Sequence, residues 1–173
     1  QNGKLIVGDH YVGGNGSILV DGNGNTSTLL KAGRSIELAG GHASLAVQDG
    51  GRVIAGAITI GDGGIVSGNS LIEGNIVMGD GGRLAPSSKT AALQIDGKLT
   101  AEGGTIVFDH LEAEQAALEV TRSVRLDGTR LDFSKLSLAE LSIGQPLQLI
   151  HSEARMSIGS KGFIIKPPAP EFS

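Results

Sequence analysis

The 173-residue sequence contains no cysteine, which excludes disulfide bonds and thiolate metal sites. It contains no tryptophan, and aromatic residues make up 3% of the chain, so the core must be built from aliphatic side chains. The formal net charge is −4 and no basic cluster is present, which argues against an electrostatic nucleic-acid binder. No apolar run approaches the roughly 18 residues that a membrane-spanning helix needs.

Glycine, in contrast, is abundant. It accounts for 28 of the 173 residues, well above the average share of about 7%. The glycines stand between short runs of Val, Ile and Leu, a pattern typical of short strands joined by tight turns. Hydrophobic residues make up 39%, so a chain of this length is predicted to fold as one domain around a real core.

A short strand-and-turn unit recurs along the chain. The tetrapeptide GDGG occupies residues 61–64 and again 79–82, each time after a stretch in which apolar residues alternate with polar ones. Related units begin near residues 97 and 123, so the spacing drifts from 18 to 26 residues. Alternation with period two is the periodicity of a β-strand.

The repeat predicts an all-β fold, a right-handed parallel β-helix with a C-terminal cap. One strand pair buries too little apolar surface to be stable alone, whereas stacked repeats cover each other. About eight coils are expected, spaced by about 4.8 Å. The predicted inward-facing core ladder consists of Ile58, Ile60, Ile76, Met78, Leu84, Leu99, Ile106, Leu126, Leu131 and Leu149.

The GDGG tetrapeptides are predicted to form corners of the coils. The predicted turn residues are Gly61, Asp62, Gly79 and Asp80. Glycine reaches positive φ without steric cost, and Asp tolerates that region better than most residues. Asp62 and Asp80 are expected to bond to their own turn backbone. A loop that cradles an anion or a metal is the less favoured alternative.

Two segments interrupt the repeat. Residues 111–120 are expected to form an outward loop or a short helical turn, and residues 134–143 a second bulge that leads into a final strand at 146–150. We therefore expect a β-helix over 1–152. Residues 153–173, which end in a proline-rich stretch, are expected to be a tail or linker.

Three ordered stretches carry a resemblance to a known family: GGRLAPSSKTAALQIDGKLTAEGGTIVFD from residue 81, ALEVTRSVRLDGTRLDF from residue 117, and SIGQPLQLIHSEA from residue 142. Together they resemble the C-terminal, autochaperone-type region of a bacterial autotransporter passenger with a pertactin-like β-helix. The resemblance covers residues 84–152 best and the first eighty residues only in style.

The resemblance implies type V secretion through the periplasm to the outer membrane and bacterial cell surface, with residues 84–152 acting as a folding nucleus. It implies two partners in the full-length protein, its own C-terminal translocator β-barrel and the outer-membrane assembly machinery. A host-cell surface is a further partner if the passenger is an adhesin or another virulence factor. Residues 153–173 would then lead toward the translocator. No catalytic residue is implied.

The histidine, acidic and hydroxyl residues give little indication of a metal site or a catalytic site. The four histidines, at 10, 42, 110 and 151, match no metal-ligand spacing. Asp109–His110 and Ser70 lack the nucleophile motif of a catalytic triad. The EF-hand-like start at Asp21 has Thr26 at position six and Ala32 at position twelve, where Gly and Glu are required.

Paired carboxylates could serve a glycosidase or lyase: Asp96 with Glu102, or Asp127 with Asp132. Charges on a solvated face are the favoured interpretation. The sequence thus predicts no enzyme, no catalytic residue, no cofactor, no metal and no nucleic-acid partner.

Three functions remain. The first is a non-catalytic stem and folding nucleus that displays an N-terminal effector such as an adhesin or protease, which predicts cooperative stability concentrated toward the C-terminus and no clustered acids. The second is an adhesive rod, which predicts an exposed apolar or charged ladder along one face. The third is a carbohydrate-active β-helix enzyme, which predicts three or more carboxylates within a groove.

Overall fold

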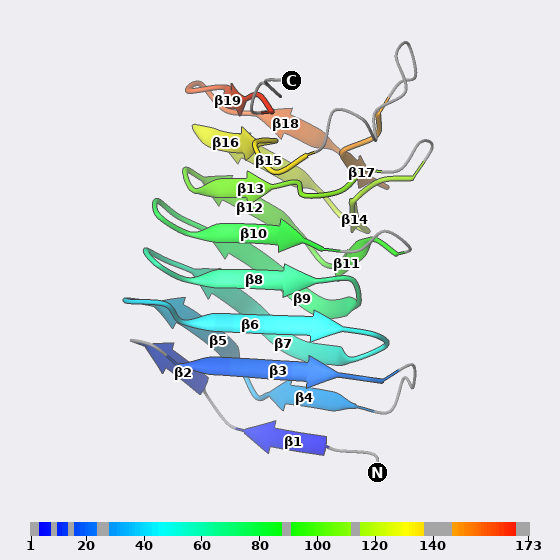
Figure 1. Cartoon of the computed structure of the whole chain (residues 1–173). Coiled ribbons are helices and arrows are strands. Elements are labelled where there is room, and N and C mark those ends of the chain that lie inside the picture. The colour runs from blue at the N-terminus through cyan, green and yellow to red at the C-terminus, as the bar shows by residue number, and fades with distance from the viewer. Residues whose placement is uncertain are drawn as a thin grey trace, which may run out of the picture.

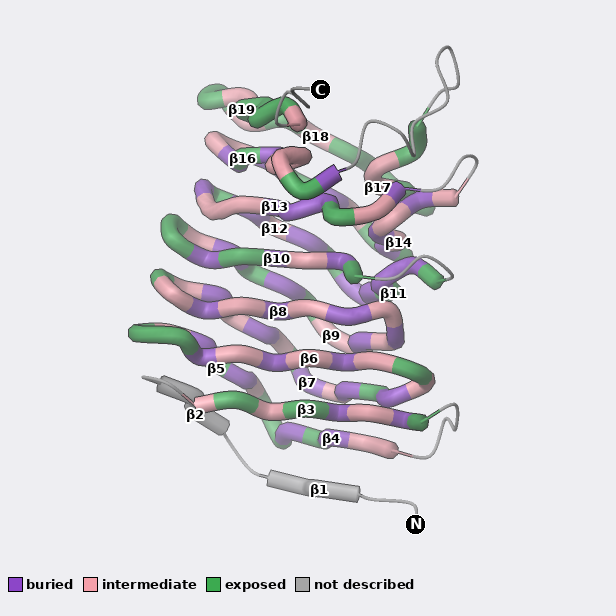
Figure 2. The backbone as a smooth tube through the Cα atoms, in the orientation of Figure 1, coloured by how far each residue is buried: buried purple, intermediate pink, exposed green. Residues whose placement is uncertain are grey.

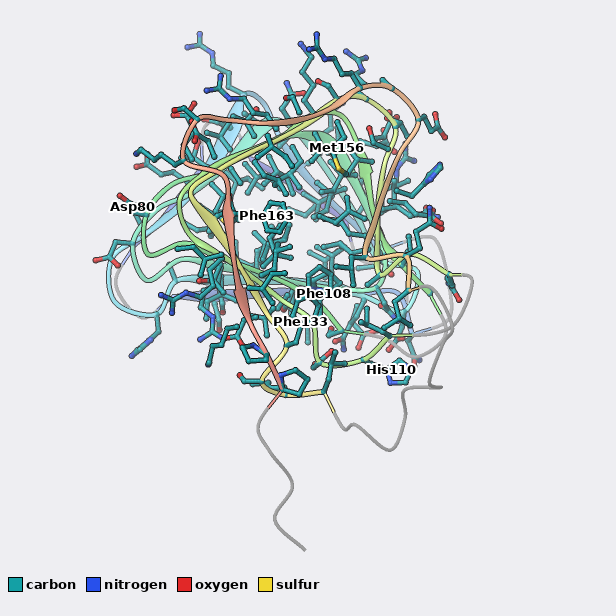
Figure 3. The ribbon with its side chains drawn as sticks, turned by 90° about the horizontal axis from the view of Figure 1, so that it is seen from above. Asp80, Phe108, His110, Phe133, Met156 and Phe163 are labelled. Atoms are coloured by element: carbon teal, nitrogen blue, oxygen red, sulfur yellow. The ribbon has the colours of Figure 1, made fainter. Side chains whose placement is uncertain are left out.

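The computed structural model describes residues 4–7, 10–13, 16–23, 28–87, 91–111, 115–136 and 147–168. These residues form strands and no helix, and the strands pair in parallel. The chain winds as a right-handed parallel β-helix, rising from the N-terminus to the C-terminus, which confirms the predicted parallel β-helix (Figures 1 and 3). The predicted C-terminal cap is not seen among the described residues, because no strand there pairs with the outer edges of β17, β18 and β19. Within the described ranges, no helix is long and apolar enough to cross a membrane.

The strands are short, as the sequence repeat predicts. In chain order they are β1 (Lys4–Val7), β2 (His10–Gly13), β3 (Ser17–Asp21), β4 (Leu29–Ala32), β5 (Ser35–Ala39), β6 (Ser44–Gln48), β7 (Arg52–Ile60), β8 (Ile65–Gly68), β9 (Leu71–Met78), β10 (Arg83–Pro86), β11 (Leu93–Asp96), β12 (Leu99–Glu102), β13 (Thr105–Val107), β14 (Leu118–Val120), β15 (Val124–Asp127), β16 (Thr129–Asp132), β17 (Ile150–Ser152), β18 (Met156–Ile158) and β19 (Phe163–Lys166).

Each coil has three faces. The first face carries β1, β4, β11, β14 and β17, the second carries β2, β5, β12, β15 and β18, and the third carries β3, β6, β8, β10, β13, β16 and β19. β7 and β9 each run across the first and second faces, with a register shift between Ile54 and Ala57 of β7. The described strands make seven coils, fewer than the eight expected, because several coils are longer than the central repeat.

The core is a set of columns in which buried side chains of successive coils stack on one another. Figure 2 shows the buried residues recurring along the strands from coil to coil. On the second face, Ile58 stands in register with Ile76, and Ile76 with Leu99. On the third face, Leu84 stands in register with Ile106. All of these side chains are fully buried. Removing an aliphatic side chain from water contributes about 1.5–3 kcal/mol, so the columns are the main source of stability.

The predicted core ladder lies on these columns. Leu149 is only partly buried and packs against the edge of the core. The other predicted members are buried, with at most 6% of their surface exposed: Ile58, Ile60, Ile76, Met78, Leu84, Leu99, Ile106, Leu126 and Leu131.

The predicted C-terminal boundary at residue 152 was wrong. Residues 153–168 continue the β-helix, because β18 pairs with β15 and β19 pairs with β16. Met156 and Phe163 take up positions directly above buried inward positions of the coil below. The prediction of a tail for the whole segment rested on its proline-rich end, although alternating apolar residues precede the prolines. Residues 169–173 lie outside the described residues.

The two predicted irregular segments differ in outcome. In 111–120, residues 118–120 form β14, whereas 112–114 lie outside the described residues. The closing strand begins later than predicted, at Ile150, while Leu147–Leu149 are not part of a strand. Most of the predicted 134–143 bulge also lies outside the described residues.

The GDGG tetrapeptides do form the corners between the second and third faces. In the first, the Gly64 amide donates a hydrogen bond to the Gly61 carbonyl at 2.9 Å, and Gly63 has a φ of 74°. In the second, the Gly82 amide donates to the Gly79 carbonyl at 3.2 Å. A side chain at Gly63 would overlap the carbonyl oxygen of Gly41 in the coil below.

The predicted role of the two aspartates was wrong. Among the described residues, neither Asp62 nor Asp80 is hydrogen-bonded to its own turn. The Asp62 carboxylate instead lies against Gly81 of the next coil, and the Asp80 carboxylate lies against Gly103, where a Cβ would overlap it. Each turn therefore needs its glycine because the coil below already fills the space.

Three alanine substitutions separate the causes of this requirement. At Gly63, φ is positive and an added Cβ would overlap backbone atoms of the coil below. At Gly162, φ is also positive, at 66°, but no atom lies near the position of the Cβ. At Gly79, φ is not positive and an added Cβ would meet no close contact. We expect Gly162→Ala to cost about 1–2 kcal/mol and Gly63→Ala to cost more. Gly79→Ala should stay within about 0.5 kcal/mol of wild type.

Denaturant unfolding of the three variants measures these costs. Equal destabilisation by Gly63→Ala and Gly162→Ala would contradict the role of coil-to-coil contact, because only the first substitution meets a neighbour.

Candidate functional site

The outer surface of the first face is hollowed into a groove. Its larger part has a volume of about 560 Å³ and its smaller part about 240 Å³, and both are lined by Leu71 and Gln94. The strands β7, β9, β11, β14 and β17 form the floor. Because these strands are in register, outward residues of successive coils form rows across the groove, such as Arg52, Leu71, Gln94, Glu119 and His151.

The larger part of the groove borders the corner between the third and first faces. Ser70 lies here and is 8% exposed. Its hydroxyl accepts a hydrogen bond from the Gly50 amide at 2.9 Å, while the Asn69 side chain accepts one from the Asp49 amide at 2.9 Å. Ser70 therefore ties two coils together, which accounts for its burial without a catalytic role.

The charged groups on the floor are mostly engaged with their neighbours. Arg52 forms an ion pair with Glu73, and this hydrogen bond raises the pKa of the Arg52 guanidinium, partly offset by desolvation. Gln94 Nε2 donates to Glu119 Oε2 at 3.2 Å, and Thr121 Oγ1 donates to Asp96 Oδ1 at 2.9 Å. These contacts hold the side chains across coils.

Three carboxylates line the smaller part of the groove. They are Asp96, Glu119 and Glu153, and His151 lies beside them with its Nδ1 3.1 Å from Gln148 Nε2. This arrangement meets the criterion stated for a carbohydrate-active site. Within the described part of the chain, however, no group of three or more His, Cys, Asp or Glu side chains is placed to hold a metal ion.

The sequence missed this grouping. It paired Asp96 with Glu102, which lie on different faces, because sequence distance hides residues that the coils stack together. The signal that could have found it is coil register, since Glu119 stands in register with Gln94, two residues before Asp96, and with His151, two residues before Glu153.

The other sequence candidates lie apart. Asp127 stands in register with Glu102, and Arg125 contacts both carboxylates, at 3.4 Å and 4.0 Å. His42 is exposed at a turn, and Figure 3 shows His110 at the periphery of the coils. The side chain of His10 lies outside what the structure describes. Asp21 accepts a hydrogen bond from the Asn23 amide, which closes a local turn, and one from the Gln48 side chain of the next coil.

Asp132 links the last two coils. Burial raises the pKa of its carboxyl, but hydrogen bonds from Ser134 and Lys166 and the positive charge of Lys166 outweigh burial, so the pKa falls to about 2. Lys166 Nζ lies 3.0 Å from Asp132 Oδ2. Phe108 and Phe133 add a stacked ring pair nearby, with centroids 5.2 Å apart.

The C-terminal coil exposes a second feature, an apolar end. In the view along the axis, Met156 and Phe163 point into the ring that the last coil encloses (Figure 3). The exposed large apolar residues of β18 and β19 are Met156, Ile158, Phe163, Ile164 and Ile165.

Comparison with known proteins adds no assignment. A scan against protein-family models found no matching family, and searches of curated proteins and of solved structures found no match.

The link between Asp132 and Lys166 makes stability depend on pH. Because the folded-state pKa, about 2, is below the ordinary value of 3.8, the ionised carboxylate stabilises the fold above pH 3.8. This contribution is lost as the pH falls toward 2. Asp132→Asn should therefore be less stable than wild type at neutral pH, and the difference should shrink in acid.

Denaturant unfolding across this pH range measures the difference, with Lys166→Gln as the partner control. Lys166→Gln should shift the loss of stability to higher pH. A difference between wild type and Asp132→Asn that is independent of pH would contradict the assignment.

Proposed function

We propose that this chain is a non-catalytic β-helical stem and folding nucleus of an autotransporter passenger. It supports translocation across the outer membrane and display of an N-terminal effector, an adhesin or a protease, at the bacterial cell surface. Its partners are its own translocator β-barrel and the outer-membrane assembly machinery. The proposal rests on the sequence resemblance of residues 84–152 and on the β-helical fold.

The observation that carries the proposal is the continuity of the inward columns. Each coil contacts mainly its neighbours, so order can propagate from one folded coil to the next. Residues 84–152 contain the buried column members Leu99, Ile106 and Leu126. A chain that emerges C-terminus first could fold stepwise on these coils, and propagation of this kind would favour export.

Surface display tests the proposal through one buried position. Leu99→Asp places an unpaired charge in a fully buried column, which should cost about 3–5 kcal/mol. Total domain stability is about 5–15 kcal/mol. When the chain is fused between an epitope tag and an autotransporter translocator, Leu99→Asp should abolish epitope accessibility on intact cells.

The matched control is Thr100→Asp on the same strand, at the adjacent outward position, which should be displayed normally. Normal display of Leu99→Asp, with both variants expressed equally, would refute a folding-nucleus role. Loss of display by both variants would point to the fusion instead.

The groove on the first face supports a second candidate, a carbohydrate-active or adhesive surface. Its carboxylates Asp96, Glu119 and Glu153 line one hollow. Carboxylate pairs of this kind serve as acid, base or nucleophile in glycoside cleavage. The described floor carries no aromatic platform for sugar rings, so recognition would depend on hydrogen bonds and charge.

An oligosaccharide panel distinguishes these functions. Turnover that is lost in both Asp96→Asn and Glu119→Gln, with unchanged folding, would support an enzyme. Binding without turnover, weakened in the same variants, would support an adhesive rod. Neither binding nor turnover is the result expected for the stem.

A further inference from the structure

The last described coil of the β-helix, formed by β17, β18 and β19, leaves one strand edge unpaired. β17, β18 and β19 each pair with one strand of the coil below, and among the described residues no strand pairs with their outer edges. An unpaired row of backbone N–H and C=O groups is a template for another strand. Terminal repeats of solenoid proteins usually carry a polar cap instead.

The side chains of this coil continue the inward columns. Met156 stands in register with Val124, and Ile165 stands in register with Leu131. Val124 is fully buried and Leu131 is 6% exposed, whereas Met156 is 45% and Ile165 59% exposed. These residues are therefore exposed because nothing described lies above them, and not because they point outward.

We propose that this apolar end binds a second copy of the same chain, end to end, around a two-fold axis. The inference goes beyond the proposed stem function: it concerns the chain without an attached translocator, because in the proposed function the translocator follows this same end. A two-fold contact uses the same surface twice and closes, so it produces a dimer instead of a filament.

The register of β19 favours such a pair. If β19 pairs antiparallel with β19 of the second copy, with Ile164 opposite its own symmetry mate, Phe163 of one copy lies opposite Ile165 of the other. Both residues occupy inward positions, so the pairing joins the two cores. Lys166 then lies opposite Gly162 and not opposite another lysine. Pro167 falls just beyond the paired stretch, where its missing N–H does no harm.

Ile164 is a specific indication of this contact. It points outward, in register with exposed Arg130 of the coil below, and is 53% exposed. An outward isoleucine on an unpaired edge strand is an aggregation hazard unless it is covered. The two-fold pairing covers it with its own symmetry mate.

The charged residues at the corner opposite β19 are also arranged favourably for a two-fold axis. The axis passes through the middle of β19 and through the corner between the first and second faces, which is formed by residues 153–155. Glu153 and Arg155 flank Ala154 there, and both are exposed. The two-fold therefore brings Glu153 of each copy toward Arg155 of the other.

Sedimentation velocity of the full 173-residue chain over a concentration series tests the proposal. We expect a reversible monomer–dimer equilibrium. A monomer at every concentration would overturn the proposal, and so would an open series of higher oligomers, which indicates head-to-tail stacking.

Ile164→Lys tests the β19 contact, because a charge on an edge strand opposes pairing. It should raise the dimer dissociation constant by roughly tenfold or more. The control is Val77→Lys, at an outward position in the middle of the rod that is 42% exposed, which should leave the constant unchanged. Equal effects of both substitutions would overturn the proposal.

A charge exchange tests the symmetry itself. Glu153→Arg and Arg155→Glu should each weaken the dimer by bringing like charges together, and the double variant should restore it. All three variants alter exposed residues and should fold, as circular dichroism can verify. Failure of the double variant to restore dimerisation would overturn the two-fold arrangement.

Discussion

The packing of inward aliphatic side chains, coil upon coil, is the constraint on which the rest of this structure depends. With no cysteine and few aromatic residues, the chain has no other means of building a core. Parallel register places residues such as Ile76 and Leu99 directly above one another. This stacking fixes the register of every strand, because a slip by one residue would turn the apolar side chains outward.

The same stacking arranges the outer surface. Each corner between the second and third faces must fit above the corner below, which is why Gly63 and Gly81 admit no side chain. The corners between the third and first faces are less constrained, and the connections between the strands there lengthen from 69–70 through 87–92 and 108–117 to 133–149 toward the C-terminus. The connections at 49–51, 69–70 and 91–92 line the larger part of the groove, so variation at this corner can change the surface without disturbing the columns.

The fold could be predicted from the sequence because period-two alternation and glycine turns are local signals. Ile58, Met78 and Leu99 were assigned to the core from alternation alone. The groove could not be predicted, because Asp96 and Glu153 meet only through the register of coils of unequal length. The last coil was missed because alternation in Met156–Ile158 is short and follows an irregular connection.

Native-state hydrogen exchange on the monomeric chain tests the continuity of the columns most directly. If coils are stabilised by neighbours on both sides, amides of β10 through β16, the strands of the proposed nucleus that have a coil on each side, should exchange slowest, and protection should fall in β17, β18 and β19. Uniform protection, or the strongest protection in the last coil, would contradict this account, because a coil covered on one side only cannot be the most stable part of a stacked core.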